Sequence, residues 1–215
     1  MSSRGETVVL SYHDTIIYES DVELLEGPHW LNDTIIGFYL EYLEEEVYGK
    51  TMFCFIRPEV TQCLKLSPLS EFPVFLDPLQ FKDKNVAVMP LNDCENPNTP
   101  GGSHWSLLVF CKTVRTFYHI DSSKGSNYSP AKLLSAKLSE YLELNGDYEF
   151  KTLNSLQQTN SYDCGVFVLC NLDNVLQHLF RHNTLDTLDT IREYQVARKR
   201  NDIKQLIINL ARHKL

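Results

Sequence analysis

The order of structural signals along the chain predicts an α+β fold. Apolar residues recur at helical spacing in the first fifth of the chain, strand-like runs fill its middle, and helical patterns return from Cys164 onward. Helices that are segregated from strands, instead of alternating with them, are typical of α+β domains. We therefore expect residues 1–215 to form a single domain in which helices flank a mixed sheet.

The N-terminal part of the chain carries two helix-start signals. The segment 20–23 is a capping-box pattern, which predicts a short helical turn from that point. Asn32 or Asp33 can cap the next helix, whose apolar positions recur at helical spacing. A strand is expected at 53–56, where Pro58 ends it.

The middle of the chain carries the clearest strand signals. Strands are expected at 86–91, 104–111 and 116–121, because these runs are rich in β-branched, aromatic and other apolar residues. Only 112–115 separates the last two runs, which predicts a hairpin. The segment 92–103 is rich in turn residues and has no core-building pattern, so we expect a loop there.

The last part of the chain returns to helical patterns. A helix is expected at 131–144, followed by a strand at 148–153. A second helix should follow Cys164, through the apolar run 166–179. A final helix is expected from about 201 to 212.

Composition and charge exclude several functional classes. A formal net charge of −8 argues against a general nucleic-acid binder and would suit a partner with a basic surface. No apolar run approaches the roughly 18 residues of a membrane span, and the first residues lack a secretory signal. The 6 cysteines include no Cys-x-x-Cys pair, which disfavours structural zinc and a disulfide framework. We expect a cytosolic or nuclear protein that binds neither nucleic acid nor membrane.

The most informative segment is 161–165, because Cys164 lies there at the start of a predicted helix. The positive end of the helix dipole favours a thiolate at such a position. Gln158, on the preceding segment, can donate an amide N–H to a developing oxyanion, as can the backbone N–H of Cys164. Taken alone, however, a buried cysteine at a helix start is more often inert packing than a nucleophile.

A cysteine hydrolase also needs a base and a group that orients the base. His104 begins one strand of the predicted hairpin and Asp121 ends the other, and a hairpin brings its far ends together. An imidazolium held beside Cys164 would stabilise the thiolate. Each residue has a simpler interpretation by itself, since His104 could be a surface histidine and Asp121 a turn former.

Two competing arrangements use neighbouring residues. His119 shares its strand face with the expected carboxylate and can point to the same site. A zinc site of His104, His119 and Cys164 is conceivable, but the spacing matches no common ligand pattern. Asp163 could replace Asp121 as the carboxylate, but its charge directly beside Cys164 would disfavour the thiolate.

In combination, these motifs resemble the Ulp/sentrin-specific cysteine proteases. The motif series consists of His104-Trp105-Ser-Leu-Leu, Tyr118-His-Ile-Asp121-Ser, Gln157-Gln158 and Asp163-Cys164-Gly165, preceded by Trp30-Leu31-Asn32-Asp33. The resemblance covers nearly the whole chain, and segments 8–12, 58–62 and 160–165 look most like the deneddylase branch. Thr159 departs from the pattern between Gln158 and Asn160, which leaves the catalytic residues unaffected.

The resemblance implies a papain-like (Ulp-type) peptidase that cleaves after the C-terminal Gly-Gly of a ubiquitin-like modifier. The deneddylase branch acts on the neddylation modifier, so this modifier and its conjugates are the expected partners of a monomeric enzyme without metal or cofactor. The implied roles are nucleophile for Cys164, base for His104, orienting carboxylate for Asp121 and oxyanion donor for Gln158.

The same resemblance implies roles for residues that would bind the modifier's tail. Trp105 would cover the two glycines in a tunnel too narrow for any Cβ, and Trp30 would help to bind the tail. Asp33 would bind a polar or basic group just before the glycines, and could also cap its helix. Loop 92–103 is expected to be mobile until the modifier orders it.

Three alternatives remain open at this point. A sentrin (SUMO)-specific protease would share the catalytic residues and differ in its modifier-binding surface. An acetyltransferase of the related bacterial effector type has the same order of base, acid and cysteine, but usually has glutamate as the acid. A non-enzymatic binding module would need a broken catalytic set, whereas all the expected positions are filled here.

Overall fold

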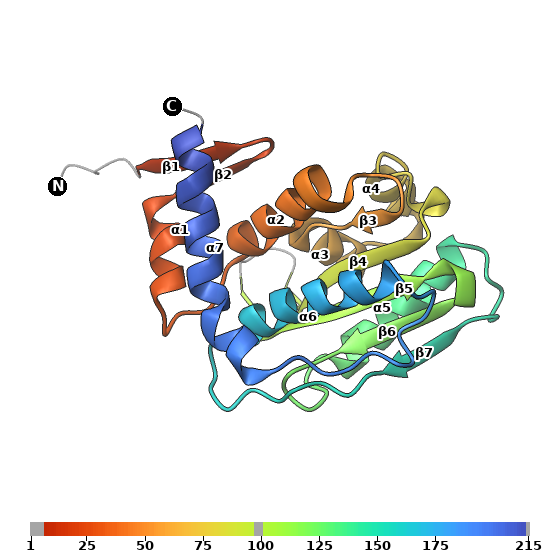
Figure 1. The fold of residues 1–215 in the computed structure, drawn as a ribbon. Helices are drawn as coiled ribbons and strands as arrows, with labels where there is room; N and C mark the ends of the chain where they lie inside the picture. The colour runs from red at the N-terminus through yellow and green to blue at the C-terminus, as the bar shows by residue number, and fades with distance from the viewer. Residues whose placement is uncertain (1–6, 97–100, 214–215) are drawn as a thin grey trace.

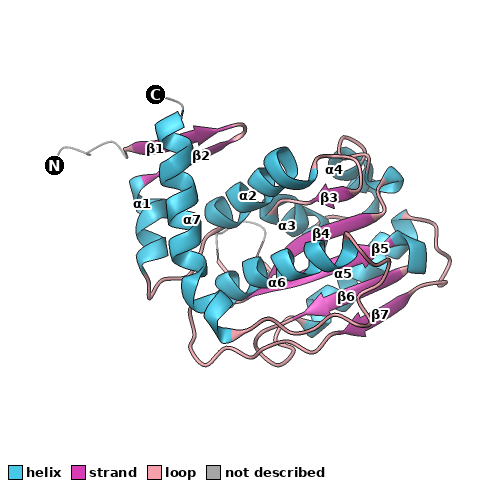
Figure 2. Cartoon of the chain, viewed as in Figure 1, coloured by secondary structure: helices cyan, strands magenta, loops and turns pink. Residues whose placement is uncertain are grey.

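The computed structural model describes residues 7–96 and 101–213. In this part of the chain, helices cover both faces of a five-stranded sheet, and a small hairpin packs beside the C-terminal helix (Figures 1 and 2). The helices are α1 Glu19–Glu23, α2 Asp33–Tyr42, α3 Pro58–Leu66, α4 Phe72–Leu76, α5 Tyr128–Tyr141, α6 Cys164–Leu179 and α7 Glu193–His213. Short helical segments lie at Leu24–Glu26, Leu43–Tyr48, Leu69–Glu71, Phe81–Asp83 and Lys112–Val114.

The main sheet is mixed, as the sequence predicts. Its strand order is β3-β4-β5-β6-β7, with parallel pairs at both edges and antiparallel pairs in the centre. The predicted hairpin is β5–β6, in which Cys111 is opposite Thr116 at the turn. The strands are β3 Phe53–Phe55, β4 Val86–Asn92, β5 Trp105–Cys111, β6 Thr116–Ile120 and β7 Glu149–Thr152.

Each face of the sheet builds its own apolar core. Val88 and Val109 face α2, α6 and α7, whereas Met89 and Phe110 face α3, α4 and α5. Successive strand residues point to opposite faces, so a strand covered on both faces is apolar throughout its length. This explains why β4 and β5 read as continuous apolar runs, and it fixes the central strands as a rigid platform.

Helix α6 crosses the sheet with its N-terminus at one end of β5. Cys164 is its first residue and is only 1% exposed. The next residue, Gly165, approaches the segment before α2 so closely that an added Cβ would lie 3.0 Å from Leu31 Cβ. Glycine at this position therefore allows the start of α6 to contact the Trp30–Leu31 segment.

Several elements differ from the sequence-based expectations. Pro58 does more than end a strand, because it occupies the first turn of α3, where a missing N–H costs nothing. Helix α5 begins at Tyr128 and α7 at Glu193, both earlier than expected. Helix α1 exists, but its N-cap is Tyr18, whose backbone N–H donates to Asp21 Oδ2 at 2.9 Å.

A second small sheet was not foreseen. Strands β1 Val8–Tyr12 and β2 Thr15–Tyr18 form an antiparallel hairpin that contacts α7.

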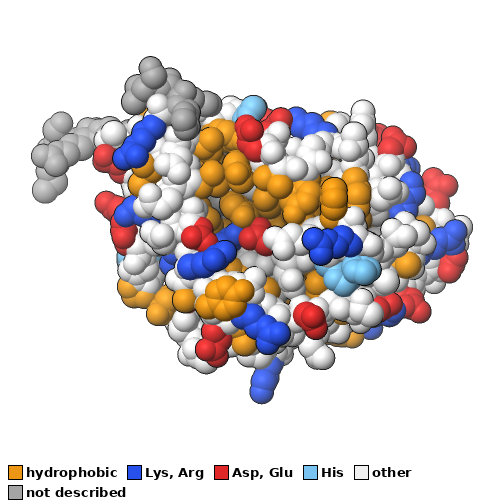
Figure 3. All heavy atoms as spheres, viewed as in Figure 1, with side chains coloured by type: hydrophobic (Ala, Val, Ile, Leu, Met, Phe, Trp, Pro, Cys, Tyr) orange, Lys and Arg blue, Asp and Glu red, His pale blue; other side chains and the backbone are white. Residues whose placement is uncertain are grey.

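On the molecular surface, hydrophobic side chains gather over α2 and β3 on the face shown in Figure 3. No helix among the described residues is long and apolar enough to cross a bilayer.

We predict that Gly165→Ala lowers the free energy of unfolding by about 1–3 kcal/mol, because the new methyl group overpacks against Leu31. Chemical denaturation measures the change. Gly37→Ala in α2 is the matched control: the atoms nearest to its added Cβ are 3.8 Å away. That variant should be as stable as the parent or more stable, since alanine is the better helix former. Equal stability of the two variants would contradict the close approach at Gly165.

Candidate active site

The two far ends of the β5–β6 hairpin hold a histidine and an aspartate in contact. His104 immediately precedes β5, Asp121 immediately follows β6, and His104 Nε2 lies 2.6 Å from Asp121 Oδ1. Both residues are buried, at 7% and 4% exposure. The proximity that the hairpin predicts is therefore confirmed.

The carboxylate of Asp121 is held by backbone donors. Ser123 N donates to Oδ1 at 2.9 Å and Asn127 N donates to Oδ2 at 3.0 Å. Burial alone would raise the Asp121 pKa, but the hydrogen bonds from His104, Asn127 and Ser123 hold it below its usual value. Asp121 is consequently an anion with a fixed orientation.

Cys164 also interacts with His104, and both line one cleft. Since Asp121 occupies Nε2, Nδ1 is the ring nitrogen left for the thiol. Burial disfavours the imidazolium, but the hydrogen bond to Asp121 and the interactions with Asp121 and Cys164 raise the His104 pKa to about 9. The base candidate is thus positively charged at neutral pH and lies next to the thiol.

Asn127 connects the histidine and the aspartate to the neighbouring strands. Its fully buried side-chain amide donates to Leu91 O at 3.1 Å, to Ser106 Oγ at 3.1 Å and, over a longer 3.4 Å, to His104 O. Its backbone N–H is one of the Asp121 donors. One side chain therefore fixes the ends of β4 and β5 relative to Asp121.

The stem of loop 92–103 is fastened beside His104. Asp93 Oδ1 accepts from Ser103 N at 2.6 Å and from His104 N at 3.1 Å, and Asp93 N donates to His104 O at 3.2 Å. From α3, Gln62 donates to Cys94 O at 2.9 Å. The prediction that this loop is mobile falls partly on residues 97–100, which lie outside the described residues.

Gln158 lies on the segment that leads to Cys164. Its Oε1 accepts from Ser122 Oγ at 2.8 Å, and its Nε2 donates to Asn160 O at 2.7 Å. A side-chain amide has two N–H groups, so one remains beyond the bond to Asn160. Gln157 has a different position, because its Nε2 donates to Asp121 O at 3.0 Å.

His119 is a buried neutral side chain. It is 0% exposed, and its Nε2 lies 3.0 Å from Ser106 Oγ. Burial lowers its pKa to about 4; the negative charge of Asp121 opposes this shift, and the positive charge of His104 adds to it. Within residues 7–96 and 101–213, no three His, Cys, Asp or Glu side chains are grouped to hold a metal ion. The alternative zinc site of His104, His119 and Cys164 therefore has no structural support.

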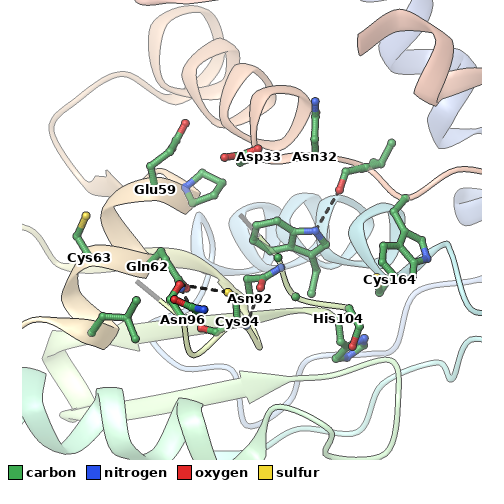
Figure 4. Close-up of a pocket in the computed structure, with 18 of the residues that line it drawn as sticks. Asn32, Asp33, Glu59, Gln62, Cys63, Asn92, Cys94, Asn96, His104 and Cys164 are labelled. Atoms are coloured by element: carbon green, nitrogen blue, oxygen red, sulfur yellow. Dashed lines mark hydrogen bonds between the residues drawn. The ribbon is translucent and has the colours of Figure 1, made fainter. Parts of the chain in front are cut away.

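A cleft of about 700 Å³ begins at Cys164 and extends toward α3 (Figure 4). The indole N–H of Trp105 donates to Leu31 O at 3.1 Å, and that of Trp30 donates to Ser161 O at 2.7 Å. Both indoles are thereby tied to backbone on a different segment of the chain. The sequence-predicted residues that line the cleft are Trp30, Asp33, His104, Trp105 and Cys164, and Asp121 supports His104 from behind.

The far part of the cleft is acidic. Asp33 on α2 and Glu59 on α3 both line it (Figure 4). Asn32, whose side chain accepts from Ile35 N at 3.0 Å, caps α2, so Asp33 is not needed as the cap. Burial raises the pKa of Glu59, and the nearby charge of Asp33 contributes to the rise. The pair forms a negative region that can attract a basic group.

Comparison with known proteins decides the family. A model of the Ulp1 protease family, C-terminal catalytic domain, matches residues 73–215. The chain belongs to the Ulp1 protease family. It is accordingly a cysteine-type peptidase, as the motif series predicts.

Similar members of the Ulp1 family align along most of the chain. Sentrin-specific protease 8 of Homo sapiens is 40% identical over 96% of this chain and 99% of its own length. NEDD8-specific protease 1 of Arabidopsis thaliana is 40% identical over 75% of this chain and 72% of its own length. The C-terminal Ulp1 protease domain solved in complex with Smt3, the yeast ortholog of SUMO, has a TM-score of 0.75 at 22% identity. The alignment with that structure covers 98% of this chain and 90% of the Ulp1 domain, which confirms the Ulp-type fold.

Sequence reasoning missed three contributors to this Ulp1-family site: Asp93, Asn127 and Glu59. The first two act through contacts with residues on other strands, which no local pattern shows. Pro58 followed by apolar residues at helical spacing could have predicted helix α3, because proline is common in the first turn of a helix. The predicted helix would have included Glu59 in its first turn.

We predict that Asp121→Asn lowers the His104 pKa by roughly 1–3 units, because the substitution removes the charge that stabilises the imidazolium. An NMR titration of the His104 ring measures the change. Asp147→Asn, at an exposed carboxylate, is the matched control and should leave this titration unchanged.

The raised His104 pKa also predicts how the stability of the fold changes with pH. Since the folded His104 pKa is raised to about 9, its stabilising contribution is complete below about pH 6.5 and is lost as the pH rises through 9. Unfolding measurements across this window should show that loss in the parent and a smaller one in Asp121→Asn. A His104 titration still near 9 in Asp121→Asn would contradict the assigned cause.

Proposed function

We propose that the chain cleaves after the C-terminal Gly-Gly of a ubiquitin-like modifier, and that the modifier is NEDD8. The observation that carries the proposal is the His104–Asp121 pair, 2.6 Å apart, with Cys164 at the same cleft and interacting with the same imidazole. The choice of NEDD8 is supported by relatives that are about 40% identical, one of which is named NEDD8-specific protease 1.

Cys164 is the nucleophile in this proposal. Its thiolate attacks the carbonyl carbon of the modifier's last glycine, and the carbonyl oxygen becomes an oxyanion. The His104 imidazolium then protonates the leaving amine, the C–N bond breaks, and a thioester remains on Cys164. The amine belongs to a lysine side chain in deconjugation, or to a following peptide in precursor maturation.

Water completes the reaction. The neutral His104 imidazole takes a proton from water, whose oxygen attacks the thioester carbonyl. Breaking the C–S bond releases the modifier's carboxylic acid, which loses its proton to the solvent, and returns the thiolate–imidazolium pair. Asp121 keeps Nε2 of the imidazole engaged throughout, so that the same nitrogen, Nδ1, serves both steps.

The oxyanion needs donors already in place. The first N–H groups of a helix lack intrahelical partners, and Cys164 is the first residue of α6. Gln158 has an amide N–H beyond the one that Asn160 accepts. We assign both as oxyanion donors, with no metal or organic cofactor in the reaction.

The residues of the cleft would allow it to bind the modifier's tail selectively. Trp105 and Trp30 border the approach to Cys164, and both are fixed by hydrogen bonds to backbone carbonyls. A passage bounded by two fixed indoles favours glycine, which has no Cβ. Asp33, with Glu59 beside it, would then bind a polar or basic group before the glycines.

The proposal extends to the form and location of the enzyme. Residues 1–215 would act as one domain and as a monomer, on modifier conjugates and without nucleic acid. The acidic composition, with a net charge of −8, supports a basic protein partner over a nucleic acid. A reducing compartment, cytoplasm or nucleus, would keep Cys164 reduced.

We predict that Cys164→Ala reduces turnover of a modifier C-terminal fluorogenic substrate by about 10⁴-fold or more, while modifier binding is retained. Cys170→Ala is the matched control in the same helix: burial raises the pKa of the Cys170 thiol to about 12, so it is an inert core residue. That variant should keep near-parental turnover. Undiminished hydrolysis by Cys164→Ala would refute the nucleophile assignment.

A substrate panel tests the modifier. We expect kcat/KM for a NEDD8 C-terminal fluorogenic substrate to exceed those for the SUMO and ubiquitin equivalents by at least about tenfold, which corresponds to about 1.4 kcal/mol of transition-state stabilisation. Faster cleavage of the SUMO substrate would overturn the modifier choice and leave the protease assignment intact. Transfer of label from acetyl-CoA without hydrolysis would instead favour the acetyltransferase alternative.

A further inference from the structure

An arginine on the C-terminal helix reaches the residue that precedes Cys164. Arg200 on α7 donates to Asp163 Oδ1 through Nε at 3.1 Å and through Nη2 at 2.7 Å. Its Nη2 also lies 3.4 Å from Tyr162 O. The pair is largely covered, with side-chain exposures of 14% for Arg200 and 18% for Asp163. The nucleophile's own loop is therefore fixed from a distant part of the chain.

The same guanidinium binds a second segment of backbone. Arg200 Nη1 donates to Leu24 O at 2.6 Å and Nη2 donates to His29 O at 2.7 Å. His29 directly precedes Trp30, whose indole N–H donates to Ser161 O at 2.7 Å. Arg200 thus links the tryptophan side of the cleft to the nucleophile side.

The charge of Arg200 also bears on the thiol. Asp163 is adjacent to Cys164, and a carboxylate so close would disfavour a thiolate. Arg200 compensates this charge with two hydrogen bonds to one oxygen, and Asn160 Nδ2 donates to the other oxygen at 2.8 Å. The His104 imidazolium and the Asp121 carboxylate behind it are further charged groups near the thiol.

We propose that Arg200 is a positioning residue for the reaction. It holds the Cys164 loop and the Trp30 segment at a fixed separation, and it balances the charge of Asp163 beside the nucleophile. The proposal rests on the proposed role of Cys164. A planar guanidinium with five donors can serve both segments at once, which the single ammonium group of a lysine cannot do.

The two parts of this role can be separated with four variants. Arg200→Gln removes both the charge and the planar set of guanidinium donors, whereas Arg200→Lys keeps the charge alone. Asp163→Asn removes the opposing carboxylate. The double variant Arg200→Gln/Asp163→Asn removes both charges. Arg198→Gln, on the same helix and exposed, is the matched control, because its ion pair is with Asp202.

Two measurements report on the two parts. The rate of Cys164 alkylation by iodoacetamide is followed against pH by mass spectrometry of the Cys164 peptide, because Cys63 is also exposed. Hydrolysis of the NEDD8 C-terminal fluorogenic substrate gives kcat and KM. Thermal unfolding of each variant shows what fraction is folded under assay conditions.

For Arg200→Gln we expect the alkylation profile to move to higher pH, because the Asp163 carboxylate beside the thiol is left uncompensated. We expect its kcat to fall about 10- to 100-fold with a smaller change in KM, since misplacing reacting groups acts on the chemical step. Arg200→Lys and the double variant should recover the parental alkylation profile but not the parental kcat. Arg198→Gln should match the parent in both measurements.

The proposal is overturned if folded Arg200→Gln keeps the parental alkylation profile and kcat. It is also overturned if activity falls only in proportion to the unfolded fraction while the profile stays unchanged, because that outcome means a purely structural role. Failure of the proposed function gives a different result, namely turnover that survives Cys164→Ala. The alkylation profile requires no turnover, so the two failures are distinguishable.

Discussion

The site depends on the charge-assisted hydrogen bond between His104 and Asp121. Burial works against both charged forms, so the pair persists because other groups stabilise each charge. Asp121 accepts hydrogen bonds from Ser123 N and Asn127 N, and His104 also interacts with Cys164. The rigid β5–β6 hairpin, covered on both faces, keeps the two side chains aligned. Everything proposed for the reaction requires this pair to stay ionised and in place.

The nucleophile is positioned by a different set of contacts. Gly165 lets the start of α6 approach Leu31, and Arg200 fastens the preceding loop from α7. The hairpin supplies the base and its carboxylate, whereas long-range packing supplies the thiol. The cleft is the junction of these two parts, with the Trp30 and Trp105 indoles bound across it by hydrogen bonds.

Local patterns in the sequence were sufficient for much of this structure. Two apolar strand-like runs separated by a short turn predicted the hairpin, and the apolar run after Cys164 predicted α6 with the correct first residue. The missed features depend on contacts between distant residues. The first half of α7 is polar, so no apolar pattern predicts it. Lys199 helps to hold this half in place by donating to Oδ2 of Asp173 on α6, at 2.6 Å. Asn127 and Arg200 likewise act on backbone groups far away in sequence, and no single-sequence pattern reports such partners.

The attachment of α7 has a consequence for biosynthesis. A chain is made from its N-terminus, so the hairpin, α2 and α6 all leave the ribosome before α7 does. Until then Asp163 has no guanidinium beside it, and the backbone of Leu24 and His29 has no connection to the Cys164 loop. A nascent chain would therefore carry all its catalytic side chains while its cleft remained unfastened. Proteolytic competence would arise late, after translation has passed Arg200.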